Sequence, residues 1–112
     1  MTMFRPAALA LTLAVLPAGA VAQQFVVPLE FWDHPRTGAA VLEQPAIREA
    51  ARLHLEQQGS RLVLHHGATQ ESRLLADELR AWLMSLALDP SRVILQNDLN
   101  LREPLRIEVV RP

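Results

Sequence analysis

Two polar segments in the sequence could form a binding site. The apolar stretch RLVL at 61–64 is followed by the polar run HHGATQESR at 65–73, and the apolar residues 25–32 are followed by Asp33 and His34. If the stretches at 25–32 and 61–66 are parallel strands of one sheet, both polar segments reach the same sheet edge. Helix N-termini point to that edge and favour anionic ligands there.

A zwitterionic ligand would suit the residues expected at this edge. Its carboxylate would accept hydrogen bonds from the free amides at the start of the second helix and from Arg73 in the first turn. Asp33 would bind an ammonium group, with His34, His66 and Thr69 beside it. The alternative is that Thr69 only caps the helix, with its hydroxyl accepting from a free amide.

Metal binding and catalysis have weaker support. His65 and His66 are neighbours in a predicted strand, so their side chains project to opposite faces and cannot share one ion. A metal site would need His34 together with one of this pair. Thr69, His66 and Asp33 could be imagined as a catalytic triad, but such groups co-occur by chance in most domains of this size. We therefore predict no catalytic residue, no bound metal and no cofactor, and expect that the protein is not an enzyme.

The N-terminus has the features of a secretory signal. Arg5 precedes an apolar run that ends in Ala20-Val21-Ala22, an A-x-A cleavage pattern, so residues 1–22 are predicted to be removed on export to the periplasm. An uncleaved membrane anchor is the alternative. Removal leaves 90 of the 112 residues, which is one small domain over 23–112 with no further membrane span. Without Arg5, 10 arginines face 12 acidic residues, a balance that does not favour nucleic-acid binding.

The hydropathy pattern predicts an α/β two-layer sandwich of order βαβαββ, with a mixed sheet and two helices on one of its faces. The first two strands are expected to be parallel and joined by a right-handed crossover. The predicted strands are 25–32, 61–66, 92–95 and 105–110, the helices are 44–58 and 70–88, and residues 96–104 form a turn. The apolar sides of the helices are Ile47, Ala50, Ala51, Leu53 and Leu55, and Leu75, Leu79, Trp82, Leu83 and Leu86.

Three stretches resemble the OmpA-like C-terminal domains of bacterial envelope proteins. They are PLEFWDHPRTGAAVLEQPAIREAARLHL, RLVLHHGATQESRLLADELRAWLMSLALDPSRVIL and LRIEVV, which together span nearly all of residues 23–112. The family binds the amino-acid-like end of the peptidoglycan stem peptide through an aspartate after the second strand and an arginine in the second helix. In this sequence Arg80 falls near the arginine position, whereas Gly67 or Ala68 stands at the aspartate position.

The resemblance implies a periplasmic, non-enzymatic envelope module whose partner is peptidoglycan. An alternative is a protein-interaction module that docks to an envelope protein through an exposed sheet edge. A small metal or ligand carrier is a third hypothesis.

Overall fold

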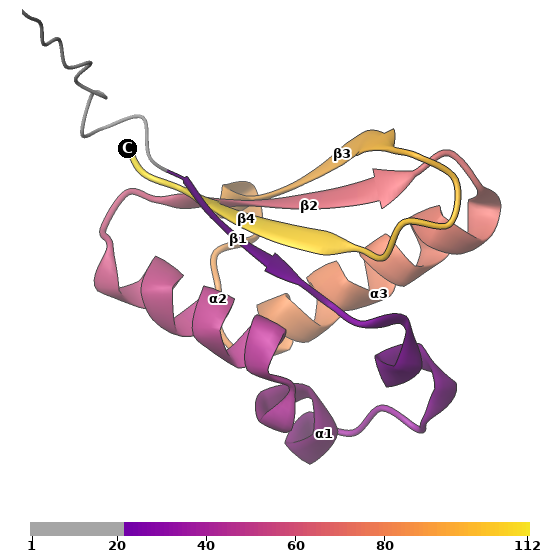
Figure 1. The fold of residues 1–112 in the computed structure, drawn as a ribbon. Helices are drawn as coiled ribbons and strands as arrows, with labels where there is room; N and C mark the ends of the chain where they lie inside the picture. The colour runs from indigo at the N-terminus through magenta and orange to yellow at the C-terminus, as the bar shows by residue number, and fades with distance from the viewer. Residues whose placement is uncertain (1–21) are drawn as a thin grey trace, which may run out of the picture.

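The computed structural model describes residues 22–112, so residues 1–21 of the predicted signal segment lie outside the described part. The strands are β1 (Ala22–Val26), β2 (Arg61–Gly67), β3 (Val93–Leu99) and β4 (Arg106–Val110). The helices are α1 (Gly38–Glu43), α2 (Pro45–Glu56) and α3 (Gln70–Ser85), with short 3-10 turns at Leu29–Asp33 and Pro90–Arg92. The α/β class and the mixed sheet with its helices on one face are as predicted (Figure 1).

The sheet has the order β1-β4-β2-β3. β4 runs antiparallel to both β1 and β2, while β2 and β3 are parallel. β1 and β2 therefore run in the same direction, as predicted, but they are not neighbours, because β4 lies between them. A central position suits β4, whose alternating Leu105, Ile107 and Val109 are all buried.

The position of β4 also shapes the connection that leads to it. β2 separates β3 from β4, so the chain from Asn100 to Leu105 must pass over the C-terminal end of β2. There the carbonyl oxygens of Leu99 and Asn100 come within 3.7 and 3.6 Å of a Cβ built on Gly67. This connection becomes one wall of the site described below.

Three predicted element boundaries were wrong. The strand predicted at 25–32 ends at Val26, since Pro28 has no amide hydrogen for the sheet and Phe31 N donates to Pro28 O to form the 3-10 turn. The residues predicted as a turn at 96–104 begin instead as strand, and β3 continues to Leu99. The second helix ends at Ser85 rather than Leu88, because Ala87 has a φ of 72°.

The first helical region is also divided differently from the prediction. Thr37 Oγ1 accepts from Ala40 N and starts α1, which was not predicted, and Pro45 occupies the first turn of α2 as expected.

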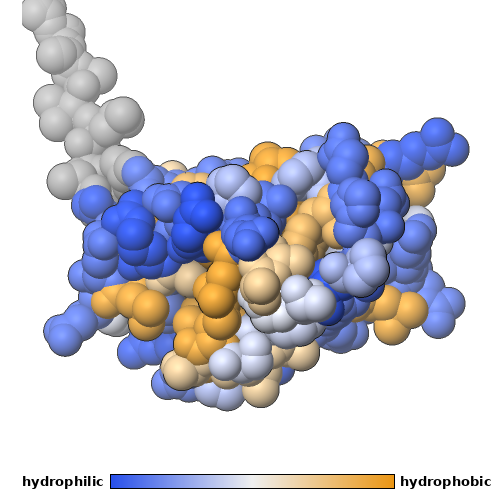
Figure 2. Space-filling model, turned by 90° about the horizontal axis from the view of Figure 1, so that it is seen from below, coloured by the Kyte–Doolittle hydropathy of each residue, from blue (hydrophilic) through white to orange (hydrophobic). Residues whose placement is uncertain are grey.

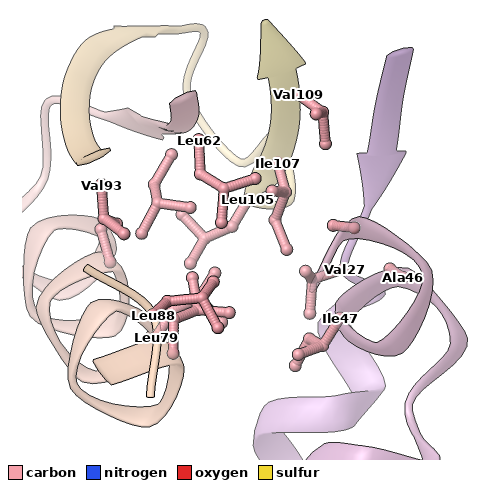
Figure 3. Packing of buried hydrophobic residues seen from close by; sticks show 14 of the residues in the cluster. Val27, Ala46, Ile47, Leu62, Leu79, Leu88, Val93, Leu105, Ile107 and Val109 are labelled. Atoms are coloured by element: carbon pink, nitrogen blue, oxygen red, sulfur yellow. The ribbon is translucent and has the colours of Figure 1, made fainter. Parts of the chain in front are cut away.

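The core lies between the sheet and the two longer helices. Figure 3 shows Ile47 of α2 and Leu79 of α3 pointing toward Leu62 and Ile107 of the sheet, and all four are fully buried. Of the predicted apolar sides, Leu55 was placed wrongly, because its side chain is exposed. Seen from the helix side, apolar and hydrophilic side chains are mixed over the surface (Figure 2). Within residues 22–112 no helix covers the opposite face of the sheet, which we call the open face (Figure 1).

Candidate functional site

A hollow of about 320 Å³ lies at the rim where β2 ends and α3 begins. We call it the rim pocket. Four segments enclose it: the 3-10 turn after β1, the β2–α3 junction, the first turns of α3, and the β3–β4 connection. Its lining residues are Leu29, Trp32, Asp33, Gly67, Ala68, Thr69, Glu71, Ser72, Leu75, Asn100, Leu101, Arg102, Glu103 and Leu105.

The β2–α3 junction is held by short-range hydrogen bonds. Thr69 Oγ1 accepts from Ser72 N at 3.1 Å, so Thr69 caps α3 as the alternative interpretation predicted. Ser72 Oγ in turn accepts from Gly67 N at 2.7 Å. The amides of Gln70 and Glu71 have no acceptor among the described residues and are left for water or a ligand.

Three charged side chains in the rim pocket, those of Asp33, Glu71 and Arg102, have no partner within residues 22–112. Asp33 and Arg102 both line the hollow, and neither makes a hydrogen bond or an ion pair there. By contrast, Glu103 Oε1 accepts from Asn100 N at 2.5 Å and braces the connection. Arg102 has a φ of 70°, a backbone conformation that is costly for a residue with a side chain. Two free carboxylates and a free guanidinium around one hollow fit a ligand that carries both charges.

An ion pair fixes the wall of the pocket that carries Asp33. The guanidinium of Arg36 donates to both carboxylate oxygens of Glu78 on α3 at 2.8 and 2.9 Å. It also donates to Trp32 O at 2.9 Å, and its Cζ lies 5.4 Å from the centre of the Trp32 ring. The hydrogen bonds from Arg36, with a further one from Trp82, hold the pKa of Glu78 below its ordinary value. This network ties the 3-10 turn that carries Asp33 to α3.

The structure brings together only some of the predicted site residues. Asp33 and Thr69 line the rim pocket, whereas His34 lies over a separate shallow depression beside Pro35 and Gln44. His66 is buried on the helix-covered face, with Nδ1 2.8 Å from the carbonyl oxygen of Gly67. Arg73 is exposed outside the pocket and lies 3.5 Å from Asp77.

Arg80 has a structural position far from the rim pocket. Its Nε donates to Val93 O at 3.3 Å and its Nη2 to Pro90 O at 3.0 Å, where β3 begins. The pocket adjoins the other end of β3, about 20 Å away for a strand of this length. Arg80 therefore holds the α3–β3 connection and does not share the hollow with Asp33.

Sequence analysis missed Arg102, the free cation of the pocket. It lies in the segment that was predicted as a featureless turn, and no spacing or motif distinguishes it from the other arginines. Only the position of β4 beyond β2 places its connection at the rim.

His65 forms a second polar cluster, on the open face. Its Nδ1 lies 2.8 Å from Asp98 Oδ1 on β3, and its Nε2 lies 2.7 Å from Glu108 Oε1 on β4. A carboxylate only accepts hydrogen bonds, so a ring nitrogen that bonds to an ionised carboxylate does so by donating its N–H. The bond from His65 lowers the pKa of Asp98 below its ordinary value of 3.8. We call these three residues the histidine clamp, because they join β3 and β4 across β2.

The remaining candidates for metal binding or catalysis are not assembled for it. No group of three or more metal-ligating side chains is placed around a common point within the described residues. His54 Nδ1 lies 2.7 Å from Ser60 Oγ, yet Ser60 is fully buried and donates to His54 O. The imidazole nitrogen must then donate to the hydroxyl, so it cannot act as a base toward Ser60.

None of the helices between residues 22 and 112 has the length and apolar character needed to cross a bilayer. The chain has no match among family models, curated proteins or solved structures.

Proposed function

We propose that this protein is a non-enzymatic binding module of the bacterial periplasm, and that its rim pocket holds the zwitterionic end of a peptide. The OmpA-like resemblance of the sequence suggests the peptidoglycan stem peptide as the source of that group. The observation that carries the proposal is that Asp33 and Arg102, which have opposite charges and no partner within residues 22–112, line the same hollow.

Each end of such a ligand has a counterpart in the pocket. The ligand ammonium would be held by Asp33, and its carboxylate by Arg102 together with the free amides of Gln70 and Glu71. Leu29, Leu75 and Leu105 supply apolar wall for the side chain of the ligand. In this proposal Arg102 takes the role that sequence analysis gave to Arg73 and Arg80.

Retention on purified peptidoglycan sacculi tests the proposal directly. We expect the native protein to be retained and to be released by free alanine, but not by N-acetylalanine or alaninamide, each of which lacks one of the two charges. Removing one charge-assisted hydrogen bond costs about 1.5–3 kcal/mol, so Asp33→Asn and Arg102→Gln should each weaken retention roughly tenfold or more.

Two exposed charges outside the pocket supply matched controls. Asp77→Asn and Arg73→Gln make the same chemical changes on the exposed side of α3 and should leave retention unchanged. If the native protein is not retained, or if the control variants lose as much as the pocket variants, the proposal fails.

The alternative function is docking to an envelope protein through a sheet edge. The observation in its favour is that both β1 and β3 are edge strands. In that case Asp33→Asn and Arg102→Gln leave partner binding intact, whereas substitutions on an edge strand abolish it.

A further inference from the structure

Leucine side chains line the rim pocket from the core to the surface. Leu105 is 3% exposed and belongs to the core, and Leu75 is partly buried against the core. Leu29 and Leu101 line the same hollow, yet they are 53% and 72% exposed. The apolar lining is therefore continuous with the core, and its outer part is exposed to solvent.

The two exposed leucines come from the segments that bring the opposite charges to the pocket. Leu29 and Asp33 lie in the same 3-10 turn, Leu29–Asp33. Leu101 directly precedes Arg102 in the β3–β4 connection. Each of these two walls thus presents one charged group and one apolar side chain to the hollow. A ligand that is held by the two charges would lie against both leucines.

Other exposed leucines of this chain do not share that position. Leu55 on α2 is 65% exposed and Leu74 on α3 is 57% exposed, and neither lines the hollow. Single exposed leucines of this kind are common on protein surfaces. Leu29 and Leu101 differ from them because one ligand in a concave site can cover both at once.

The size of the hollow favours a ligand larger than alanine. Its volume of about 320 Å³ falls within the range of small-molecule pockets, roughly 300–1,000 Å³. The methyl group of alanine would leave most of the leucine lining exposed to water. A longer aliphatic side chain would cover it, and burial of apolar surface strengthens binding.

We propose that the ligand of the rim pocket is an α-amino acid, free or at the end of a peptide, whose side chain is aliphatic and longer than that of alanine. Asp33 and Arg102 hold its ammonium and carboxylate groups, and its side chain lies against Leu29, Leu75 and Leu101. The inference rests on the proposed function, because it takes the zwitterionic group as bound at those two charges.

Calorimetric titration of the full-length expression product with free amino acids tests the inference. A fully buried methylene group strengthens binding about fourfold. Leu29 and Leu101 are at the surface, so we expect incomplete burial, and norleucine should bind roughly fivefold or more tightly than alanine, with norvaline between them. Glutamine, whose side chain is of similar length but polar, should bind no more tightly than alanine.

The exposed leucines supply two pairs of matched variants. Leu101→Ser and Leu29→Ser should each reduce the preference for norleucine over alanine at least about twofold and leave alanine binding nearly unchanged. Leu55→Ser and Leu74→Ser should keep the native preference, because neither side chain lines the hollow. All four side chains are more than half exposed, so none of the substitutions should disturb the fold.

The outcomes separate this inference from the proposed function. Alanine and norleucine of equal affinity, or the same loss of preference in Leu55→Ser as in Leu101→Ser, would overturn the inference and leave the zwitterion site standing. A protein that binds neither amino acid contradicts both. Norleucine added to the protein on sacculi identifies the source of the ligand. Release supports a cell-wall ligand in the rim pocket, whereas continued retention with norleucine bound supports a free amino acid.

Discussion

The rim pocket and the histidine clamp differ in what their charged groups already bind. In the clamp, Asp98 and Glu108 both face the His65 ring at hydrogen-bond distance, and the cluster is closed upon itself. In the rim pocket, Asp33 and Arg102 face a hollow and have no partner among the described residues. Charges that satisfy one another hold the fold, whereas charges held apart by the fold are available to a ligand. The sequence gives no sign of this difference, since histidines attract attention and a turn arginine does not.

Breaking the clamp should have the largest effect on stability. His65→Leu leaves two carboxylates on either side of β2 without their donor, and we expect a loss of about 2–3 kcal/mol, reduced from the fully buried case because both carboxylates are partly exposed. Urea unfolding should show a lower midpoint with an unchanged slope. His34→Gln, on an exposed histidine outside the clamp, is the control and should change little. Equal midpoints for the two variants would contradict a structural role for the clamp.

Acid should weaken the same cluster. The hydrogen bond from His65 lowers the pKa of Asp98 in the folded protein, so the unfolded chain binds a proton more readily. The stability that Asp98 contributes is therefore complete above its ordinary value of 3.8 and is lost as the pH falls below 3.8 toward the folded pKa. The stability difference between the native protein and Asp98→Asn should shrink over this window. If this difference stays constant between pH 7 and the acid end of the window, Asp98 does not contribute to the loss of stability in acid.

Arg80→Ala tests whether this arginine belongs to the site or to the fold. It removes two hydrogen bonds to carbonyl oxygens at the start of β3, so we expect a loss of about 1 kcal/mol in the free energy of unfolding. Retention on sacculi should remain at the native level under conditions where the variant is folded. Lost retention in a folded Arg80→Ala would instead favour the arginine role that the OmpA-like resemblance implies.

Arg102→Gly should separate binding from stability most clearly, because it should abolish ligand retention while slightly raising the free energy of unfolding. Glycine adopts positive φ without the strain that a side chain adds, so we expect stability to rise by about 0.5–1 kcal/mol while ligand retention is lost. Ala87→Gly is the matched control, because Ala87 has a φ of 72° but lies outside the pocket. It should gain similar stability and keep its binding. If Arg102→Gly keeps full retention, its guanidinium is not part of the site.

The parts of the fold that were predicted correctly depend on local pattern. The alternation of Leu105, Ile107 and Val109 identified β4, and Pro45 marked the start of α2. Thr69 was recognised as a possible cap because capping needs only residues three apart in the chain. The prediction that His65 and His66 face opposite sides follows from strand geometry and was confirmed.

The errors occurred where distant residues decide the structure. Residues 96–99 have turn-forming side chains, yet they continue β3 beside β2, and Asp98 contacts His65 on that neighbouring strand. Leu55 fits the apolar side of α2 by spacing, but α2 ends at Glu56, and Leu55 is exposed there. Patterns that use only residues close together in the sequence cannot show which strand lies alongside or where the core ends.

The sequence by itself determined the main strands and helices, the α/β class and the sheet edge at which Asp33 and Thr69 lie, because periodicity and capping act over a few residues. Only the tertiary structure decided that β4 lies between β1 and β2, which brings the chain carrying Arg102 over the end of β2. It likewise placed Arg80 at the start of β3, away from the rim pocket, and enclosed His65 between two acids. The physical reason is that strand order is set by burial of the whole sheet, and strand order determines which distant charges meet.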